Sequence, residues 1–182
     1  MVSQAELQAA AGRTLPDLLA PQLRIVFCGI NPGLYSGVTG HHFARPGNRF
    51  WPTLHAAGFT PRQFAPAEEA LLLPLGYGIT NLVARASARA DELTSAELVA
   101  GGAMLGEKMR WVQPLVLAVL GITAYRTAFR RPKATLGPQP ERIGPAQVWV
   151  LPNPSGLNAH YQLADLARVY RDFRLGIETA AN

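Results

Sequence analysis

Two asparagine–proline turns follow apolar runs at distant points of the sequence. The first is Ile30-Asn31-Pro32-Gly33, and the second is Pro152-Asn153-Pro154-Ser155-Gly156. A carboxamide both donates and accepts hydrogen bonds, and it is not basic. Together with the glycines and aromatic residues that follow the first turn, such groups suit a planar, neutral, hydrogen-bonding ligand such as a nucleobase.

Signatures of other chemistries are absent from the sequence. It contains no G-x-x-x-x-G-K-[ST] loop, no G-x-G-x-x-G after the first apolar run and no G-x-S-x-G elbow. His41 and His42 are adjacent, so their side chains diverge, and Cys28 is the only cysteine. We therefore expect no metal ion and no cofactor.

The pattern of apolar residues predicts the elements that position the two turns. Four apolar runs predict strands, and amphipathic stretches between and after them predict helices, one of them starting at the capping box Thr94-Ser95-Ala96-Glu97. Alternating strands and helices favour an α/β fold, specifically a three-layer α/β/α sandwich around a central, mainly parallel four-stranded sheet. The predicted strands are 23–28, 77–83, 115–120 and 147–152, and the predicted helices are 48–57, 94–111, 123–129 and 162–177.

The remaining segments and the length complete the predicted organisation. At 182 residues the chain is the size of a single domain, 1–182, with residues 1–20 as an N-terminal arm or short helix. The proline- and glycine-rich stretch 130–145 is expected to be an exposed loop. Because the carboxyl ends of parallel strands form one edge of a sheet, where ligands bind, the two asparagine–proline turns should form the two lips of one cleft.

Composition points to a polyanionic partner. The formal net charge is +5, and fifteen of the seventeen basic residues are arginine, the side chain that grips phosphate best. An arginine-rich composition also follows from GC-rich codon usage, so the charge alone does not establish a nucleic-acid partner. A lone cysteine fits a reducing cytoplasm, the N-terminus lacks the pattern of a secretion signal, and no apolar run suits a membrane span. We expect a cytoplasmic monomer.

Four motifs in order carry a resemblance to a known family. GINPG, TGHHFARPGNRFWPTLHAAGFT, GITNLV and LPNPSGL together resemble the mismatch-specific uracil/thymine DNA glycosylases of the uracil-DNA glycosylase superfamily, over residues 25–170. The resemblance implies hydrolysis of the bond between base and deoxyribose, with uracil as the base and thymine or modified pyrimidines as further candidates. It also implies that the base is flipped out of mispaired double-stranded DNA and that an abasic site remains.

The resemblance assigns roles in catalysis and base recognition. Asn31 corresponds to the residue that positions the attacking water, although by itself it also suits a plain Asx-turn. Asp91 is an alternative proton acceptor if its loop folds over the cleft; otherwise it is an exposed acid before Thr94. The implied base-binding residues are Ile30 and Phe43 through their backbone N–H groups, Phe43 by stacking, Asn81 through its donor–acceptor edge, and Gly33, which leaves space for a methyl group at C5.

The second turn and its neighbours resemble the family's DNA-binding loop. Leu157 corresponds to the wedge that fills the gap left by the flipped nucleotide, or else it caps the last helix. Some relatives have arginine where this chain has Ala159, so discrimination of the opposite base should be relaxed and single-stranded DNA is a further candidate substrate. The remaining implied contacts to DNA are Ser36, Asn153, Ser155, Gly156 and Asn158, with Arg45, Arg49 and the cluster Arg130-Arg131-Lys133 as candidate phosphate contacts.

Two other functions remain open on the sequence. One is a nucleic-acid-binding module with an inactive nucleobase pocket, which would bind DNA without releasing a base. The other is a hydrolase of free nucleosides, which would need no wedge. The sequence contains only the lysines Lys108 and Lys133, and neither lies in a motif, which argues against a Schiff-base step.

Overall fold

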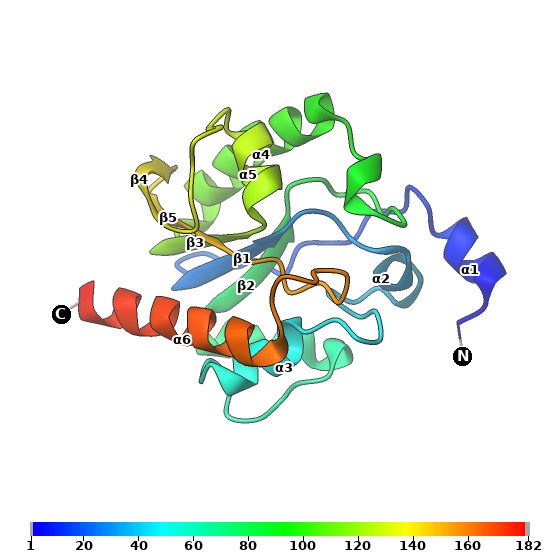
Figure 1. Cartoon of the computed structure of the whole chain (residues 1–182), viewed down its shortest axis with the longest axis horizontal. Helices are drawn as coiled ribbons and strands as arrows, with labels where there is room; N and C mark the ends of the chain where they lie inside the picture. Colours follow the sequence, from blue (N-terminus) through cyan, green and yellow to red (C-terminus); the bar gives the residue numbers. More distant parts are fainter. Residues whose placement is uncertain (1, 181–182) are drawn as a thin grey trace.

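Helices cover both faces of a five-stranded sheet in the computed structural model, which describes residues 2–180 (Figure 1). The strand order is β2-β1-β3-β5-β4. β2, β1, β3 and β5 are parallel, and β4 pairs with β5 in the antiparallel direction. The bounds are β1 Ile25–Gly29, β2 Tyr77–Asn81, β3 Val116–Leu120, β4 Gly137–Ile143 and β5 Ala146–Leu151.

The central strands are apolar on both sides because each side meets a helical layer. In β1, Ile25 and Phe27 join a cluster with α3 (Phe50–Ala56) and α6 (Leu163–Ala180). Val26 and Cys28 face the other cluster, formed with α4 (Ser95–Val112) and α5 (Ile122–Ala128). Figure 1 shows α4 and α5 on one side of the sheet and α3 and α6 on the other, which confirms the predicted three layers.

The four predicted helices are present with small shifts of their ends. The Thr94 hydroxyl accepts a hydrogen bond from the Glu97 N–H, and the Glu97 carboxylate accepts one from the Thr94 N–H, so the predicted capping box starts α4. Three short helical elements were not predicted: α2 Leu34–Thr39, η1 Pro66–Leu75 and η2 Ala90–Glu92. Glycine in α2 and proline in η1 interrupt any apolar period, and η2 has only three residues.

The prediction of four strands and of a loop over 130–145 is wrong, because β4 lies inside that stretch. Pro138 and Pro140 made a strand improbable, since proline cannot donate to a sheet ladder. β4 tolerates both because it is the edge strand, with only β5 beside it, and because its pairing shifts register between Pro138 and Arg142. The prolines therefore mark the end of the sheet.

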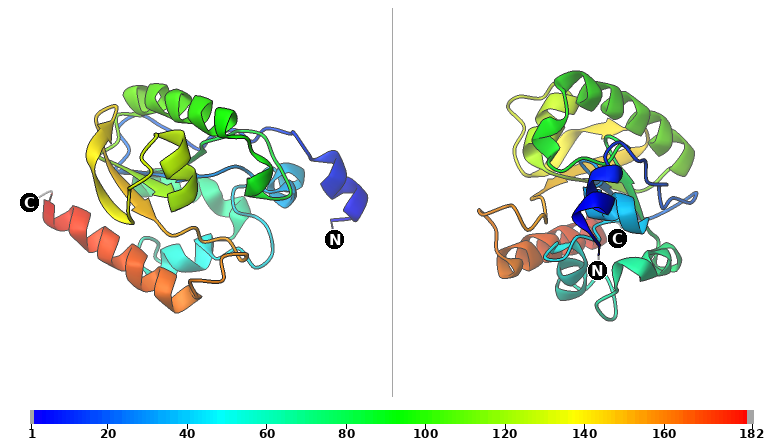
Figure 2. Two further views of the ribbon diagram at one scale, coloured as in Figure 1. Left: turned by 45° about the horizontal axis from the view of Figure 1, so that its top comes forward. Right: turned by 90° about the vertical axis from the view of Figure 1, so that its right-hand side faces the viewer.

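The predicted N-terminal arm contains a short helix, α1 Gln4–Ala9, which begins with a capping box between Ser3 and Glu6. Figure 2 shows this helix at the margin of the molecule. The chain then runs along β2, where Leu18 exchanges two backbone hydrogen bonds with Ile79, of 2.9 and 2.8 Å. This pairing brings the segment before Leu18 to the edge of the sheet at which the two asparagine–proline turns lie.

No helix in the described residues is long and apolar enough to cross a membrane. Residues 2–180 also hold no group of three or more His, Cys, Asp and Glu side chains that could bind a metal ion. The ends of the predicted 1–182 domain, Met1 and residues 181–182, lie outside the described part of the chain.

Candidate active site

A cavity of about 340 Å³ lies at the carboxyl edge of the parallel strands, between the turns that follow β1 and β5. Asn31 from the first turn and Leu157 from the second loop both line it, so the predicted meeting of the two turns is confirmed. Asp91 and Gly156 are not among the lining residues. The other lining residues that the sequence singled out are Ile30, Gly33, Ser36, Phe43, Arg45, Asn81, Asn153, Ser155 and Asn158.

The orientation of the Asn31 carboxamide is fixed by three acceptors. Its Nδ2 lies 3.2 Å from the Pro32 carbonyl oxygen, 3.0 Å from that of Arg85 and 2.8 Å from Ser87 Oγ. Ser87 Oγ donates to the Arg89 carbonyl at 2.7 Å, so it can accept from Asn31. Since the three acceptors require the nitrogen on their side, the Asn31 oxygen is left to accept a hydrogen bond from a ligand or water.

Phe43 forms an aromatic wall of the cavity. Its ring stacks on Phe50 with a centroid distance of 4.0 Å and an interplanar angle of 22°. Its backbone has a φ of +53°, a left-handed conformation that is rare for a bulky side chain. The Ser36 hydroxyl accepts from the Ala44 N–H at 3.1 Å and so supports this conformation. Strained backbone of this kind is concentrated at binding sites, and here it places the ring at the cavity.

Asn81, at the end of β2, is buried and lines the same cavity. A Cβ atom on Gly29 would lie only 2.5 Å from Asn81 Oδ1, so glycine at the end of β1 leaves the room that this carboxamide occupies. On its other side, Asn81 Nδ2 lies 3.4 Å from Nδ1 of the buried His42. Burial lowers the pKa of His42 below its ordinary value.

The second lip is a loop held by its own hydrogen bonds, with an exposed apolar tip. The Ser155 N–H donates to Asn153 Oδ1 at 2.9 Å, the Leu157 N–H donates to Ser155 Oγ at 3.2 Å, and Asn158 Nδ2 donates to the Asn153 carbonyl at 3.0 Å. A Cβ on Gly156 would lie 2.7 Å from the Gly47 carbonyl oxygen, so only glycine fits that close approach. The Leu157 side chain at the tip of this loop is 64% exposed.

Arg49 and Tyr170 brace this loop from inside. The Arg49 guanidinium donates to the carbonyl groups of Tyr161, Ser155 and Asn158. The buried Tyr170 hydroxyl donates to the Pro152 carbonyl at 2.9 Å. The sequence suggested that Arg49 contacts phosphate, but its guanidinium is occupied by the loop.

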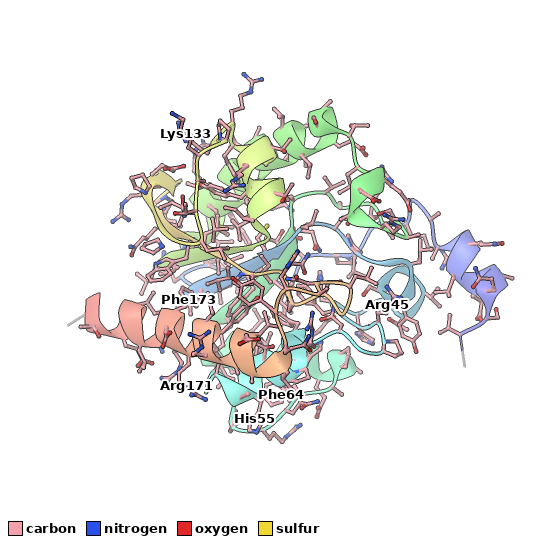
Figure 3. All side chains as sticks on the ribbon, viewed as in Figure 1. Arg45, His55, Phe64, Lys133, Arg171 and Phe173 are labelled. Carbon is pink, nitrogen blue, oxygen red and sulfur yellow. The ribbon has the colours of Figure 1, made fainter. Side chains whose placement is uncertain are left out.

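The other candidate phosphate contacts fall into two regions. Arg45 is exposed and lines the cavity, whereas Lys133 lies across the molecule from it (Figure 3). Arg130 and Arg131 line a separate cavity with Lys133, formed in part by the beginning of β4. Of the basic residues proposed from the sequence, Arg45 is therefore the one at the cleft.

Asp91 does not line the cavity, although its neighbours Arg89 and Ala90 do. It lies in η2, its side chain is 62% exposed, and it pairs with the exposed Arg89. Lys108, the lysine nearest the sheet, is held by Asp17 at 2.7 Å and by Thr80 Oγ1 at 3.0 Å, and it does not line the cavity either. The structure therefore brings the asparagines, Phe43 and Leu157 together and leaves Asp91 and both lysines outside.

Sequence reasoning missed two residues that support the site. Ser87 holds Asn31, and His42 contacts Asn81. Nothing in the residues around Ser87 indicates its contact with Asn31, because Ser87 lies in a polar loop far from Asn31 in the sequence. His42 lies in the glycine- and histidine-rich motif after the first turn, but its adjacency to His41 was considered only as a poor metal site.

The fold and the cavity define an α/β protein with a cleft at the carboxyl edge of its sheet that is lined by carboxamides and by no carboxylate, suited to a planar polar ring. The model of the uracil DNA glycosylase superfamily matches residues 16–174. The chain is also similar to the solution NMR structure of a candidate uracil DNA glycosylase from Methanosarcina acetivorans, with a TM-score of 0.54 and 18% identity over 90% of this chain and 98% of that one. At that identity the likeness concerns the fold.

The match of the family model shows that this chain belongs to the uracil DNA glycosylase superfamily. Membership implies a hydrolytic N-glycosylase whose partner is DNA.

Proposed function

We propose that the protein is a monofunctional DNA glycosylase that flips uracil out of mispaired DNA, hydrolyses its N-glycosidic bond and leaves an abasic site. In this proposal the chain acts as one domain and as a monomer, and thymine and modified pyrimidines are further substrates. The observation that carries the proposal is the Asn31 carboxamide, held by three acceptors with its oxygen available, on the lip opposite the exposed Leu157.

The chemistry follows from positions in the cavity. The flipped base stacks on Phe43, and Asn81 pairs with its N3–H and O4 edge. Asn31 Oδ1 accepts one proton of a water and directs the water oxygen at the anomeric carbon. The new carbon–oxygen bond forms as the carbon–nitrogen bond breaks, its electron pair leaves with the base, and the proton is released to solvent. An amide adds little general-base assistance, so the rate must come from positioning and electrostatics.

Contacts to the DNA backbone are assigned to the rim of the cavity. Arg45, Ser155 and the loop around Leu157 line the cavity. Ser36 is buried and already accepts from Ala44, so its hydroxyl proton remains for a ligand. The absence of both lysines from the cavity lining supports hydrolysis by water over a covalent lyase step.

A panel of oligonucleotides tests the proposal. Each contains one uracil, thymine or modified pyrimidine, in a duplex opposite each of the four bases or in a single strand, and base release is read as alkali-sensitive cleavage. We expect release of uracil from the mispaired duplex to be fastest. DNA binding without release from any substrate would favour an inactive binding module, and release from free nucleosides alone would favour a nucleoside hydrolase.

Gly33 offers a test of the substrate range. Its φ of −75° suits any residue, and a Cβ there would meet nothing within 4 Å, so a side chain can be added without strain. We expect Gly33→Tyr to reduce thymine release relative to uracil release by about 10-fold or more, because the ring occupies the space of the C5 methyl group. Gly33→Ala is the control and should retain both. Equal loss of both activities in Gly33→Tyr would show that Gly33 does not set the range.

A further inference from the structure

A chain of hydrogen bonds leads from a backbone carbonyl to the wall of the cavity. His42 is 2% exposed, and its Nε2 lies 2.9 Å from the Pro16 carbonyl oxygen. Its Nδ1 lies 3.4 Å from Nδ2 of Asn81, which lines the cavity. Pro16 is held in place through its neighbour Asp17, whose carboxylate binds Lys108 at 2.7 Å and Thr80 at 2.7 Å.

The chemistry of the groups sets the direction of each bond. A carbonyl oxygen can only accept, so His42 Nε2 must carry a proton. In the neutral imidazole Nδ1 is then an acceptor, and the Asn81 group that faces it must be the NH₂ group. This assignment agrees with the position of Asn81 Oδ1 next to Gly29, which also lines the cavity.

Several charged or titratable groups act on His42. Glu69 of η1 accepts from the His42 backbone N–H at 2.8 Å and from His41, while Asp17 lies on the other side and is paired with Lys108. The hydrogen bond to Pro16 and the two carboxylates favour the protonated imidazole and His41 opposes it, but burial has the largest effect and lowers the pKa of His42 below its ordinary value. Burial therefore favours the neutral imidazole, which agrees with Nδ1 accepting from Asn81.

We propose that His42 is a positioning residue that sets the choice between uracil and cytosine by holding Asn81 in one of its two orientations. This inference rests on the proposed function. With the NH₂ group held by His42, Asn81 offers an oxygen and its remaining N–H, which match N3–H and O4 of uracil. Cytosine offers an acceptor at N3 and a donor at N4. In the same orientation of Asn81, the amide oxygen would face the N3 acceptor and the amide N–H would face the N4 donor, so buried polar groups would be left without hydrogen-bond partners.

A consequence is a predictable response to pH. When His42 is protonated and Nε2 remains on Pro16, Nδ1 becomes a donor, and Asn81 must turn its oxygen toward it. The hydrogen-bond donor and acceptor that Asn81 presents to the cavity then exchange places. The preference for uracil should be fully present above the pKa of His42 and should weaken as the pH falls through it.

The test uses duplexes that contain a 2′-fluoro-2′-deoxyuridine or a 2′-fluoro-2′-deoxycytidine opposite guanine, because the fluorine resists bond cleavage and binding is read alone. For the wild type and for His42→Asn, we would measure the ratio of the dissociation constants of the two duplexes. Because both proteins bind the same two duplexes, any difference between the duplexes themselves cancels when the two ratios are compared. An amide at position 42 can donate or accept, so we expect the preference for uracil to fall by about 10-fold. His41→Asn is the matched control and should retain the wild-type ratio.

An unchanged ratio in folded His42→Asn would overturn the proposal. Should that variant fail to fold, ¹⁵N NMR of the wild type decides: a proton on Nε2 supports the proposal, and a proton on Nδ1 alone overturns it. As the pH is lowered through the pKa of His42, the uracil preference of the wild type should weaken and that of His42→Asn should not. Failure of the wild type to release uracil from any substrate would instead remove the proposed function.

Discussion

Replacement of Asn31 by alanine is expected to slow uracil release by about 100-fold or more, because misplacement of a reacting group by about 1 Å can cost that much. The variant loses the oxygen that orients the water and removes the Asn31 donor from the Arg85 carbonyl, whereas the Pro32 carbonyl still accepts from the Ser87 N–H at 3.1 Å. Single-turnover release from a mispaired uracil duplex measures the effect, and binding of a 2′-fluoro duplex separates chemistry from affinity.

Asp91→Asn is the matched comparison, because Asp91 is the one carboxylate for which the sequence suggested proton transfer. Its exposed pair with Arg89 contributes little to stability. We expect its rate to stay within about 2-fold of the wild type. A loss of activity in Asp91→Asn, with residual activity in Asn31→Ala, would reverse the two roles and require the loop with Asp91 to close over bound DNA.

Replacement of Leu157 by alanine is expected to slow uracil release from duplex DNA by about 10-fold or more, because separating stacked bases costs a few kcal/mol and the wedge fills the gap. Release from a single strand should be unchanged, since flipping a base out of a single strand leaves no gap in a duplex for the wedge to fill. The measurement is the ratio of single-turnover rates on a duplex and on the same strand alone.

Leu163→Ala is the control for Leu157→Ala. Leu163 is also exposed, at 40%, but it starts α6 and does not line the cavity. Its duplex-to-single-strand ratio should equal that of the wild type. If Leu157→Ala reduced release from the duplex and from the single strand equally, Leu157 would contribute to the cavity and would not act as a wedge. If release from both substrates were unchanged, Leu157 would only cap the last helix.

The elements that surround the site could be predicted because their signals are local. Short apolar runs mark the four parallel strands, of which only 115–120 is continuous, and the spacing of Thr94 and Glu97 marks the start of α4. The meeting of Asn31 and Leu157 followed from a single rule, that parallel strands end at one edge. β4 was missed because Pro138 and Pro140 look like loop residues unless the strand is known to be at the edge.

The contacts that refine the site could not be predicted because they are long-range. Asn81 and His42 are 39 positions apart, and the separation between Asn31 and Ser87 is 56. Arg49 was assigned to phosphate because an arginine in a basic, glycine-rich segment usually faces solvent. Its actual acceptors are backbone carbonyls more than a hundred positions later, and nothing near Arg49 in the sequence encodes them.

The bracing of the Leu157 loop by Arg49 and Tyr170 has a consequence for how lesions would be found. Because these hydrogen bonds already hold the loop, contact with DNA should require little further loss of conformational entropy from the protein. Under the proposed function, almost all of the free-energy cost of flipping a base then comes from opening the base pair in the duplex. Pairs that open easily would be sampled first, so weak pairing itself would guide the search before any base reaches the cavity.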